Sequence, residues 1–147
     1  MSYYQNYRSR LREVLNDAEM NDPEGHRLDL ESGLEQWCRQ TERTARSGGH
    51  HFFAGNGASA MMASHMAVDC TKNAGFNATA FNDAALLTAV GNDIGYDSVF
   101  SYPLERYGRV GDVLVTISAS GNSPNILKGL QAARDRGLFR VTLTGMR

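Results

Sequence analysis

The sequence predicts an α/β fold: a three-layer, doubly wound parallel sheet with helices on both faces, preceded by two further helices. Three observations support this fold class. From residue 50 onward, short apolar runs alternate with helix-forming segments, as is typical of parallel sheets. One run, Asp112–Ile117, is continuous and rich in β-branched residues, as expected of a strand buried on both faces. Before residue 50, apolar residues recur every three or four positions, which indicates amphipathic helices.

The region before residue 50 predicts two helices joined by a turn. The first helix covers residues 4–18 and the second covers residues 30–45, each with one apolar stripe. Between them, Asp22–Gly25 contains a proline and a glycine, and this composition favours a turn. The stripes could pack within the chain or against a second subunit, and the pattern alone favours neither. They comprise Tyr4, Tyr7, Leu11, Val14 and Ala18 in the first helix and Leu30, Leu34, Trp37, Thr41 and Ala45 in the second.

The main fold is predicted to alternate strands with helices along the chain. Pro103 falls inside one of these helices and is expected to bend or interrupt it. Gly137 suits a left-handed cap at the end of the last helix. The expected strands are residues 51–54, 78–81, 112–117 and 140–143, and the expected helices are residues 59–72, 84–90, 97–107 and 124–136.

Composition excludes several classes of protein. The 147 residues suffice for the core of one ordinary domain, and the hydrophobic share of 41% argues against a disordered or fibrous chain. With 15 basic and 16 acidic residues, the chain has no general attraction to nucleic acid or to an anionic membrane. No apolar run is long enough for a membrane span, and the N-terminus is unlike a signal peptide, so we expect a cytoplasmic protein. Cys38 and Cys70 do not form a metal-spaced pair and are expected to be packing residues.

A serine-rich loop, Ser118–Pro124, connects the clearest strand to the last helix. In α/β sheets, ligands bind beyond the carboxyl ends of the strands, and the free N–H groups of a helix N-terminus favour an anion. Ser118, Ser120 and Ser123 add hydroxyl groups at this point, and Gly121 allows close approach of the backbone. Because the loop contains no lysine or arginine, neutral donors would hold the anion, as suits a small phosphorylated metabolite. The alternative is a turn that only caps the helix.

A second glycine-rich loop, Gly55–Ala60, follows the first predicted strand of the main fold. It matches the dinucleotide fingerprint, but that fingerprint expects an acidic residue about 20 positions later at the end of the next strand. Here the next strand ends at Asn82-Asp83, further along the chain. The alternative is that Asn56, Gly57 and Ser59 contact a sugar that lies between the two loops.

Two further groups of polar residues are candidates for chemistry. His65 and Asp69 are four positions apart on one predicted helix, so they could share a metal ion, orient a proton transfer, or form only a surface hydrogen bond. Gly91–Gly95 is predicted to be a polar turn, in which Asp93 could hold sugar hydroxyls or cap the next turn. The adjacent histidines at positions 50 and 51 are interpreted as structural or exposed to solvent.

Together these segments resemble the SIS (sugar isomerase) domain family, in particular its phosphoheptose isomerases, which interconvert sedoheptulose 7-phosphate and mannoheptose 7-phosphate. The resemblance runs from about residue 51 to the last residue and implies a flavodoxin-like fold. It assigns residues 1–49 to oligomerisation helices and residues 50–147 to a phosphosugar-binding domain. The motifs are Gly55–Ser59, His65 with Asp69, Val90–Asp93, Gly111–Leu114, Ser118–Ser123 and Thr142–Gly145.

The resemblance also implies roles for individual residues. His65 matches a zinc ligand, and Asp69 stands where these isomerases have a glutamate that serves as catalytic base and metal ligand. The family forms homotetramers in which the N-terminal helices make a central bundle. The substrate-binding positions are Asn56, Gly57, Ala58, Ser59, Asn92, Asp93, Ser118, Ala119, Ser120 and Ser123.

Three departures from the family pattern accompany this resemblance. Asp69 is one methylene shorter than the glutamate, and Ala119 replaces a common threonine. The family continues into a further strand and a helix that carry a glutamine and a histidine of the metal site, so the chain ending at Arg147 is expected to be incomplete at this end. One branch of the family lacks the glutamate and binds the bacterial replication initiator as a scaffold. The alternative to an isomerase is therefore a non-catalytic phosphosugar-binding protein.

Overall fold

Helix α1 and a short β-ribbon belong to the first of two units, residues 1–39, in a computed structural model that describes residues 2–145. Ser2 and Gln5 form a capping box at the start of α1 (Tyr3–Asn16), which ends before Ala18 of the predicted stripe. Strands β1 (Met20–Asn21) and β2 (Arg27–Leu28) pair antiparallel, and the predicted turn lies between them. The ribbon was not predicted, because two-residue strands leave no periodic pattern.

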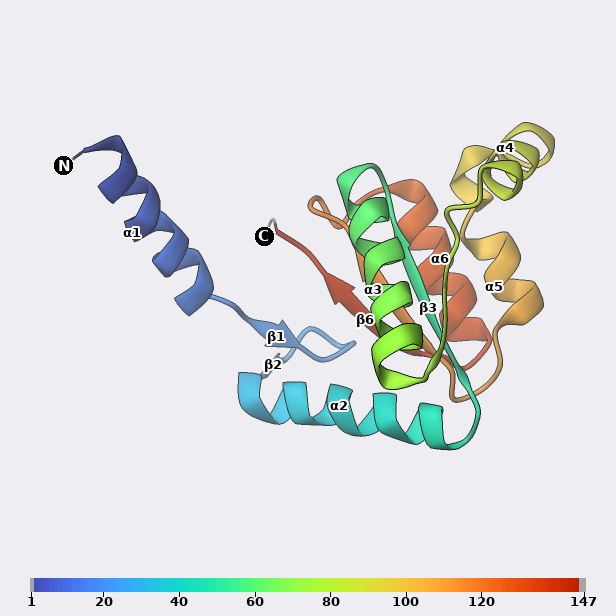
Figure 1. Cartoon of the computed structure of the whole chain (residues 1–147), viewed down its shortest axis with the longest axis horizontal. Coiled ribbons are helices and arrows are strands. Elements are labelled where there is room, and N and C mark those ends of the chain that lie inside the picture. The colour runs from blue at the N-terminus through green and yellow to red at the C-terminus, as the bar shows by residue number, and fades with distance from the viewer. Residues whose placement is uncertain (1, 146–147) are drawn as a thin grey trace. The chain divides into compact units, whose positions relative to one another are not determined.

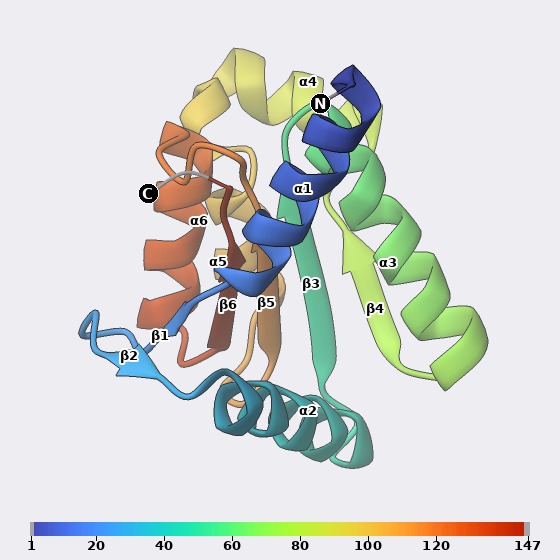
Figure 2. The same cartoon turned by 90° about the vertical axis from the view of Figure 1, so that its left-hand side faces the viewer.

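The second unit, residues 40–147, contains the parallel sheet in the order β4-β3-β5-β6. Helix α2 (Leu30–Arg46) spans the division between the units. Figures 1 and 2 show α3 on one face of the sheet and α5 and α6 on the other, which confirms the doubly wound, three-layer prediction. The strands are β3 (His50–Gly55), β4 (Asn77–Ala80), β5 (Val113–Ile117) and β6 (Phe139–Leu143), and the helices are α3 (Ala58–Ala74), α4 (Ala84–Asp93), the 3-10 helix η1 (Tyr96–Ser98), α5 (Ser101–Tyr107) and α6 (Pro124–Asp135).

The core of the second unit lies between the sheet and the helices α5 and α6. All five residues of β5 are buried, as predicted from its continuous apolar run. Phe52 of β3 stacks on Phe81, with ring centroids 5.3 Å apart, and Leu104 and Ile126 are fully buried against the same cluster. This burial fixes the carboxyl ends of β3 and β5, from which the two candidate loops leave.

One helix boundary differs from the prediction, and the interruption expected from Pro103 is confirmed. Helix α4 continues through Gly91 to Asp93, and the N–H groups of Ile94 and Gly95 both donate to the carbonyl of Val90. The expected 97–107 helix is interrupted before Pro103, between η1 and α5. Pro103 is the third residue of α5, where its missing N–H removes no intrahelical hydrogen bond.

The neighbouring histidines at the start of β3 are structural, as predicted. His51 is buried, and its ring nitrogens lie 3.4 Å and 3.2 Å from the carbonyl oxygens of Asn77 and Thr41. The His50 ring contacts the Thr79 hydroxyl at 2.8 Å, and its partial burial lowers the pKa of the imidazole. Cys38 is exposed, so the expectation that it packs in the interior was wrong.

Across residues 2–145, no helix combines the length and the apolar character that a membrane crossing requires.

Candidate functional site

The two loops singled out from the sequence follow neighbouring strands. β3 pairs with β5 in parallel, and Gly55 lies opposite Ile117 at the end of this pairing. The loop at 56–59 and the loop at 118–123 therefore leave the same edge of the sheet side by side. Each loop leads directly into a helix, α3 and α6 respectively, so two helix N-termini with their partial positive charge lie at this edge.

The serine loop is open to an anion. Gly121 has a φ of +67°, and its N–H donates to the carbonyl of Ser118, which makes a tight turn. Ser123 is the N-cap residue of α6, yet its hydroxyl makes no capping hydrogen bond. Within residues 2–145, the backbone N–H groups of Ala119, Ser120, Ser123 and Asn125 likewise have no hydrogen-bond acceptor. A loop that only capped the helix would use the Ser123 hydroxyl for this purpose, so the arrangement favours an added anion.

The Ser118 and Ser120 side chains differ in exposure. Ser118 is buried at the end of β5, and its N–H donates to the carbonyl of Leu143 in the neighbouring strand. Ser120 is exposed, and its hydroxyl oxygen accepts from the N–H of Asn122 at 3.3 Å. Its hydroxyl hydrogen can therefore point outward to a ligand.

The first loop brings the backbone close to helix α3. A Cβ atom at Gly55 would lie 2.7 Å from the backbone of Ser59, so only glycine allows this approach. Gly57 has a φ of +56° and is the N-cap residue of α3, without a side chain to cap the helix. Ala58 and Ser59 form the first turn of α3, so all the predicted residues of this loop lie at the helix N-terminus.

The Asn56 side chain joins the two loops. Its Nδ2 donates to Asn125 Oδ1 at 2.9 Å, and Asn125 Nδ2 donates back to Asn56 Oδ1 at 2.8 Å. The Tyr96 hydroxyl donates to the same Oδ1 at 3.3 Å. Asn125 and Tyr96 were missed from the sequence, although Asn125 directly follows the predicted loop. No local pattern indicates a contact between residues 69 positions apart in the chain.

His65 and Asp69 face one another on α3, as their spacing predicts. His65 Nε2 lies 3.3 Å from Asp69 Oδ2, and their side chains are 75% and 37% exposed. Asp69 Oδ1 accepts a hydrogen bond from Asn73 Nδ2 at 3.2 Å. The imidazole and carboxylate are suitable donors for zinc, but zinc sites use three or four protein ligands. Residues 2–145 hold no group of three or more such ligands, so the described residues do not form a zinc site by themselves.

The predicted turn at Gly91–Gly95 is corrected by the structure. Asn92 and Asp93 are the last residues of α4, both are exposed, and Asn92 Nδ2 donates to Asp93 Oδ1 at 2.8 Å. Tyr96, three residues later, is the member of this segment that contacts the first loop through Asn56.

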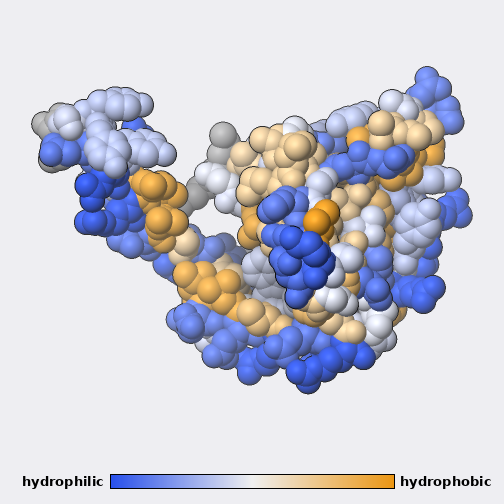
Figure 3. Space-filling view, in the orientation of Figure 1, coloured by the Kyte–Doolittle hydropathy of each residue, from blue (hydrophilic) through white to orange (hydrophobic). Residues whose placement is uncertain are grey.

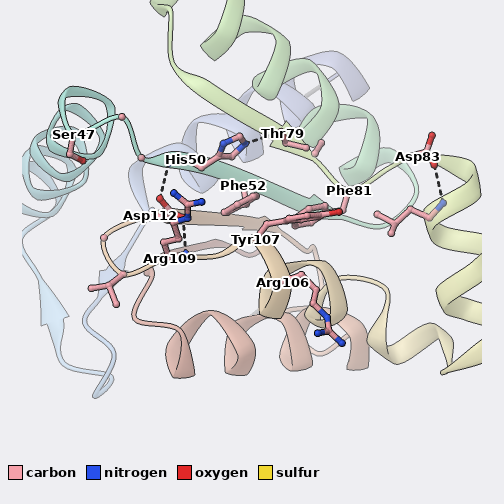
Figure 4. A pocket seen from close by; sticks show the side chains of 16 residues that line it. Ser47, His50, Phe52, Thr79, Phe81, Asp83, Arg106, Tyr107, Arg109 and Asp112 are labelled. Atoms are coloured by element: carbon pink, nitrogen blue, oxygen red, sulfur yellow. Dashed lines mark hydrogen bonds between the residues drawn. The ribbon is translucent and has the colours of Figure 1, made fainter.

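A cavity of about 790 Å³ lies elsewhere, along β3 and β4 (Figure 4). Its lining includes His50, Phe52, Phe81 and Tyr107, and none of the predicted site residues borders it. The candidate site therefore lies apart from this cavity, at the edge of the sheet where β3 and β5 end.

Comparison with known proteins shows which family this chain resembles. The SIS domain model matches residues 26–145. The phosphoheptose isomerase of Akkermansia muciniphila is 43% identical over 118 residues, which cover 76% of this chain and 62% of that protein. That of Enterobacter sp. (strain 638) is 44% identical over 105 residues, which cover 68% of this chain and 55% of that protein. The chain thus spans about three-fifths of the length of these curated relatives.

Solved structures share the same fold. A phosphoheptose isomerase from Neisseria gonorrhoeae aligns with a TM-score of 0.71 and 29% identity, over 97% of this chain and 76% of that one. A phosphoheptose isomerase from Francisella tularensis aligns with a TM-score of 0.76 over 98% of this chain and 76% of that one, and at 24% identity it bears on the fold alone. The family match, the sequence identity and the shared fold together show that this chain belongs to the SIS domain family.

Proposed function

We propose that this chain is a phosphosugar aldose–ketose isomerase of the sedoheptulose 7-phosphate type, with a role in carbohydrate metabolism. The observation that carries the proposal is the serine loop, where the Ser123 hydroxyl and several backbone N–H groups have no partner within residues 2–145. The sugar would extend from this loop toward Asn56–Ser59. The names of the two curated relatives support the substrate class.

The proposed chemistry needs a base and an acid. In an aldose–ketose isomerisation, a base removes a proton from the carbon next to the carbonyl group, an enediol forms, and the proton returns to the neighbouring carbon. A second proton moves between the two oxygens, so the overall composition is unchanged. We assign the base to Asp69, with His65 at 3.3 Å to orient its carboxylate. Zinc stays a prediction for this chain, and His65 and Asp69 would supply two of its ligands.

A non-catalytic phosphosugar-binding role is the second candidate. It is favoured by the aspartate at position 69, one methylene shorter than the family glutamate, and by the exposure of the histidine beside it. An isomerisation assay with sedoheptulose 7-phosphate, with and without zinc, separates the two functions. Turnover supports the isomerase, whereas binding without turnover supports the binding protein.

Replacing Ser120 with alanine should weaken the binding of sedoheptulose 7-phosphate about tenfold, because one hydrogen bond to a charged phosphate is lost. Titration calorimetry measures this change. Ser9→Ala, on the exposed surface of α1, is the matched control and should leave the affinity unchanged. Equal affinity of the Ser120 variant and the unaltered chain would mean that the loop only begins a helix.

The N-terminal helices are proposed to form the core of a homotetramer. Helix α1 buries none of its residues, and apolar side chains gather along its C-terminal half (Figure 3). Leu11, Val14 and Leu15 are all exposed there. Light scattering should give the mass of a tetramer for the unaltered chain and a smaller species for Leu11→Glu. If the unaltered chain is a monomer, the apolar stripe would pack within the chain rather than against a second subunit. The cytoplasmic location also stays a prediction.

A further inference from the structure

We infer that Asn125 and Tyr96 are positioning residues, which act through Asn56 to hold the phosphate loop at a set distance from the loop proposed to contact the sugar. This inference rests on the proposed function. The two reciprocal hydrogen bonds between Asn56 and Asn125 are called the amide pair below. The amide pair joins residues that directly follow β3 and the serine loop.

The amide pair is built to be rigid. Asn125 is only 2% exposed, and each amide both donates to and accepts from the other at 2.8–2.9 Å. The Tyr96 hydroxyl supplies a second donor to Asn56 Oδ1, so both lone pairs of that oxygen are in use. Buried polar groups are costly to leave without a partner, which favours this one arrangement over others.

The arrangement connects three segments of the candidate site. Asn125 follows the N-cap residue of α6, Asn56 precedes the N-cap residue of α3, and Tyr96 follows the end of α4. Asn56 Oδ1 accepts two hydrogen bonds, and Asn56 Nδ2 donates one of its two hydrogens to Asn125. One Nδ2 hydrogen therefore remains for a ligand. Its main contribution is therefore to fix the relation between the loops.

The amide pair should affect the binding affinity of short and long ligands differently. Inorganic phosphate would contact the serine loop alone, whereas a sugar phosphate would contact both loops. Loss of the amide pair should therefore weaken sugar-phosphate binding while leaving phosphate binding nearly unchanged, since only the relation between the loops is altered. A residue that merely supported the serine loop would affect both ligands equally.

The test compares the affinities of inorganic phosphate and sedoheptulose 7-phosphate, measured by titration calorimetry on the full chain. Asn125→Ala should lower the affinity for the sugar phosphate about tenfold and that for phosphate less than twofold. Tyr96→Phe removes only one hydroxyl from a largely exposed side chain, so it tests the same difference between sugar-phosphate and phosphate affinity without risk to the fold. Tyr107→Phe, which likewise removes one hydroxyl from an exposed tyrosine, is the matched control and should leave the ratio unchanged.

Asn125→Asp provides a rescue that a purely structural role would not show. Protonated, the new side chain can still donate to Asn56 Oδ1, whereas the ionised form cannot donate and repels that oxygen. Burial raises the pKa of a carboxylic acid, so the protonated form should persist above the usual range. Relative to the unaltered chain at the same pH, sugar-phosphate affinity should be about tenfold higher at pH 5 than at pH 8.

The outcomes separate this inference from the proposed function. If the unaltered chain binds both ligands and the variants lower both affinities in proportion, or neither, the positioning role is wrong and the proposed function stands. If the unaltered chain does not bind sedoheptulose 7-phosphate, the proposed function fails and the positioning role fails with it.

Discussion

Replacing Asp112 with alanine should lower the free energy of unfolding by about 3 kcal/mol and the midpoint of thermal unfolding by roughly 9 °C. Asp112 is 3% exposed and lies just before β5. Its Oδ1 accepts from the N–H of His50 and its Oδ2 accepts from the N–H of Arg109, both at 2.8 Å. Each hydrogen bond to a charged acceptor contributes about 1.5–3 kcal/mol, so the expected loss is the lower bound for two such bonds.

The position of the Asp112 carboxylate explains the large expected loss in the free energy of unfolding. It joins the first residue of β3 to the turn that precedes β5, so the amino ends of the two central strands are held by one side chain. Without it, two backbone donors lose their partner and the register of the strands loses a constraint. The amide of Asp112→Asn keeps one acceptor and should cost about half as much.

Thermal and urea unfolding of the two variants provide the measurement. Asp135→Ala removes an exposed carboxylate that accepts a hydrogen bond from Gln131, so as a control it should change stability by less than about 0.5 kcal/mol. Equal stability of the Asp112→Ala variant and the control would mean that water replaces both hydrogen bonds at the edge of the sheet.

Replacing Asp69 with asparagine should reduce the turnover of sedoheptulose 7-phosphate by about 10²–10⁴-fold, the usual contribution of a positioned base. The amide has nearly the same shape and keeps an oxygen beside His65, but it cannot take a proton. Substrate affinity should change little, since the phosphate is proposed to bind at the serine loop. The fall should therefore appear in kcat rather than in KM.

Asp69→Glu tests the same assignment in the opposite direction. Displacement of a catalytic group by about 1 Å can change a rate on the order of 10²-fold, so restoring the missing methylene should raise turnover by up to that factor. Asn73→Ala, which removes the hydrogen bond to Asp69 Oδ1, should have a much smaller effect. Unchanged turnover in both Asp69 variants would exclude this carboxylate as the base. A chain that binds the substrate but shows no turnover with either carboxylate would support the non-catalytic function.

The strands and the two loops could be predicted because their signals are local. A continuous β-branched run can bury both faces only in a sheet, and β5 is such a run. The serine loop and the loop after β3 follow strands directly, so a parallel sheet brings them to one edge without any knowledge of side-chain contacts. The spacing of His65 and Asp69 likewise fixed their contact, since residues four apart on a helix are neighbours.

The end of α4 could not be predicted in the same way. A glycine at 91 is an ordinary sign of a helix boundary, yet it does not end its helix. Gly91 lies inside α4, and the chain turns at Gly95, whose φ is +134°. The break before α5 comes at Val99-Phe100, as Pro103 predicts, because a proline disfavours a helix through the carbonyl of the residue four positions earlier, Val99.

Composition and periodicity predicted the fold class and the strand–loop–helix order, because they report which segments are buried and which turn. The pairing of Asn56 with Asn125, the hydrogen bond from Tyr96 and the contacts of Asp112 at the amino ends of β3 and β5 become visible only in the folded chain. Apart from the hydrogen bond between Arg109 and Asp112, these contacts link residues between 40 and 69 positions apart. They form when packing brings the segments together and leaves buried polar groups that must find partners, a requirement that no local sequence pattern expresses.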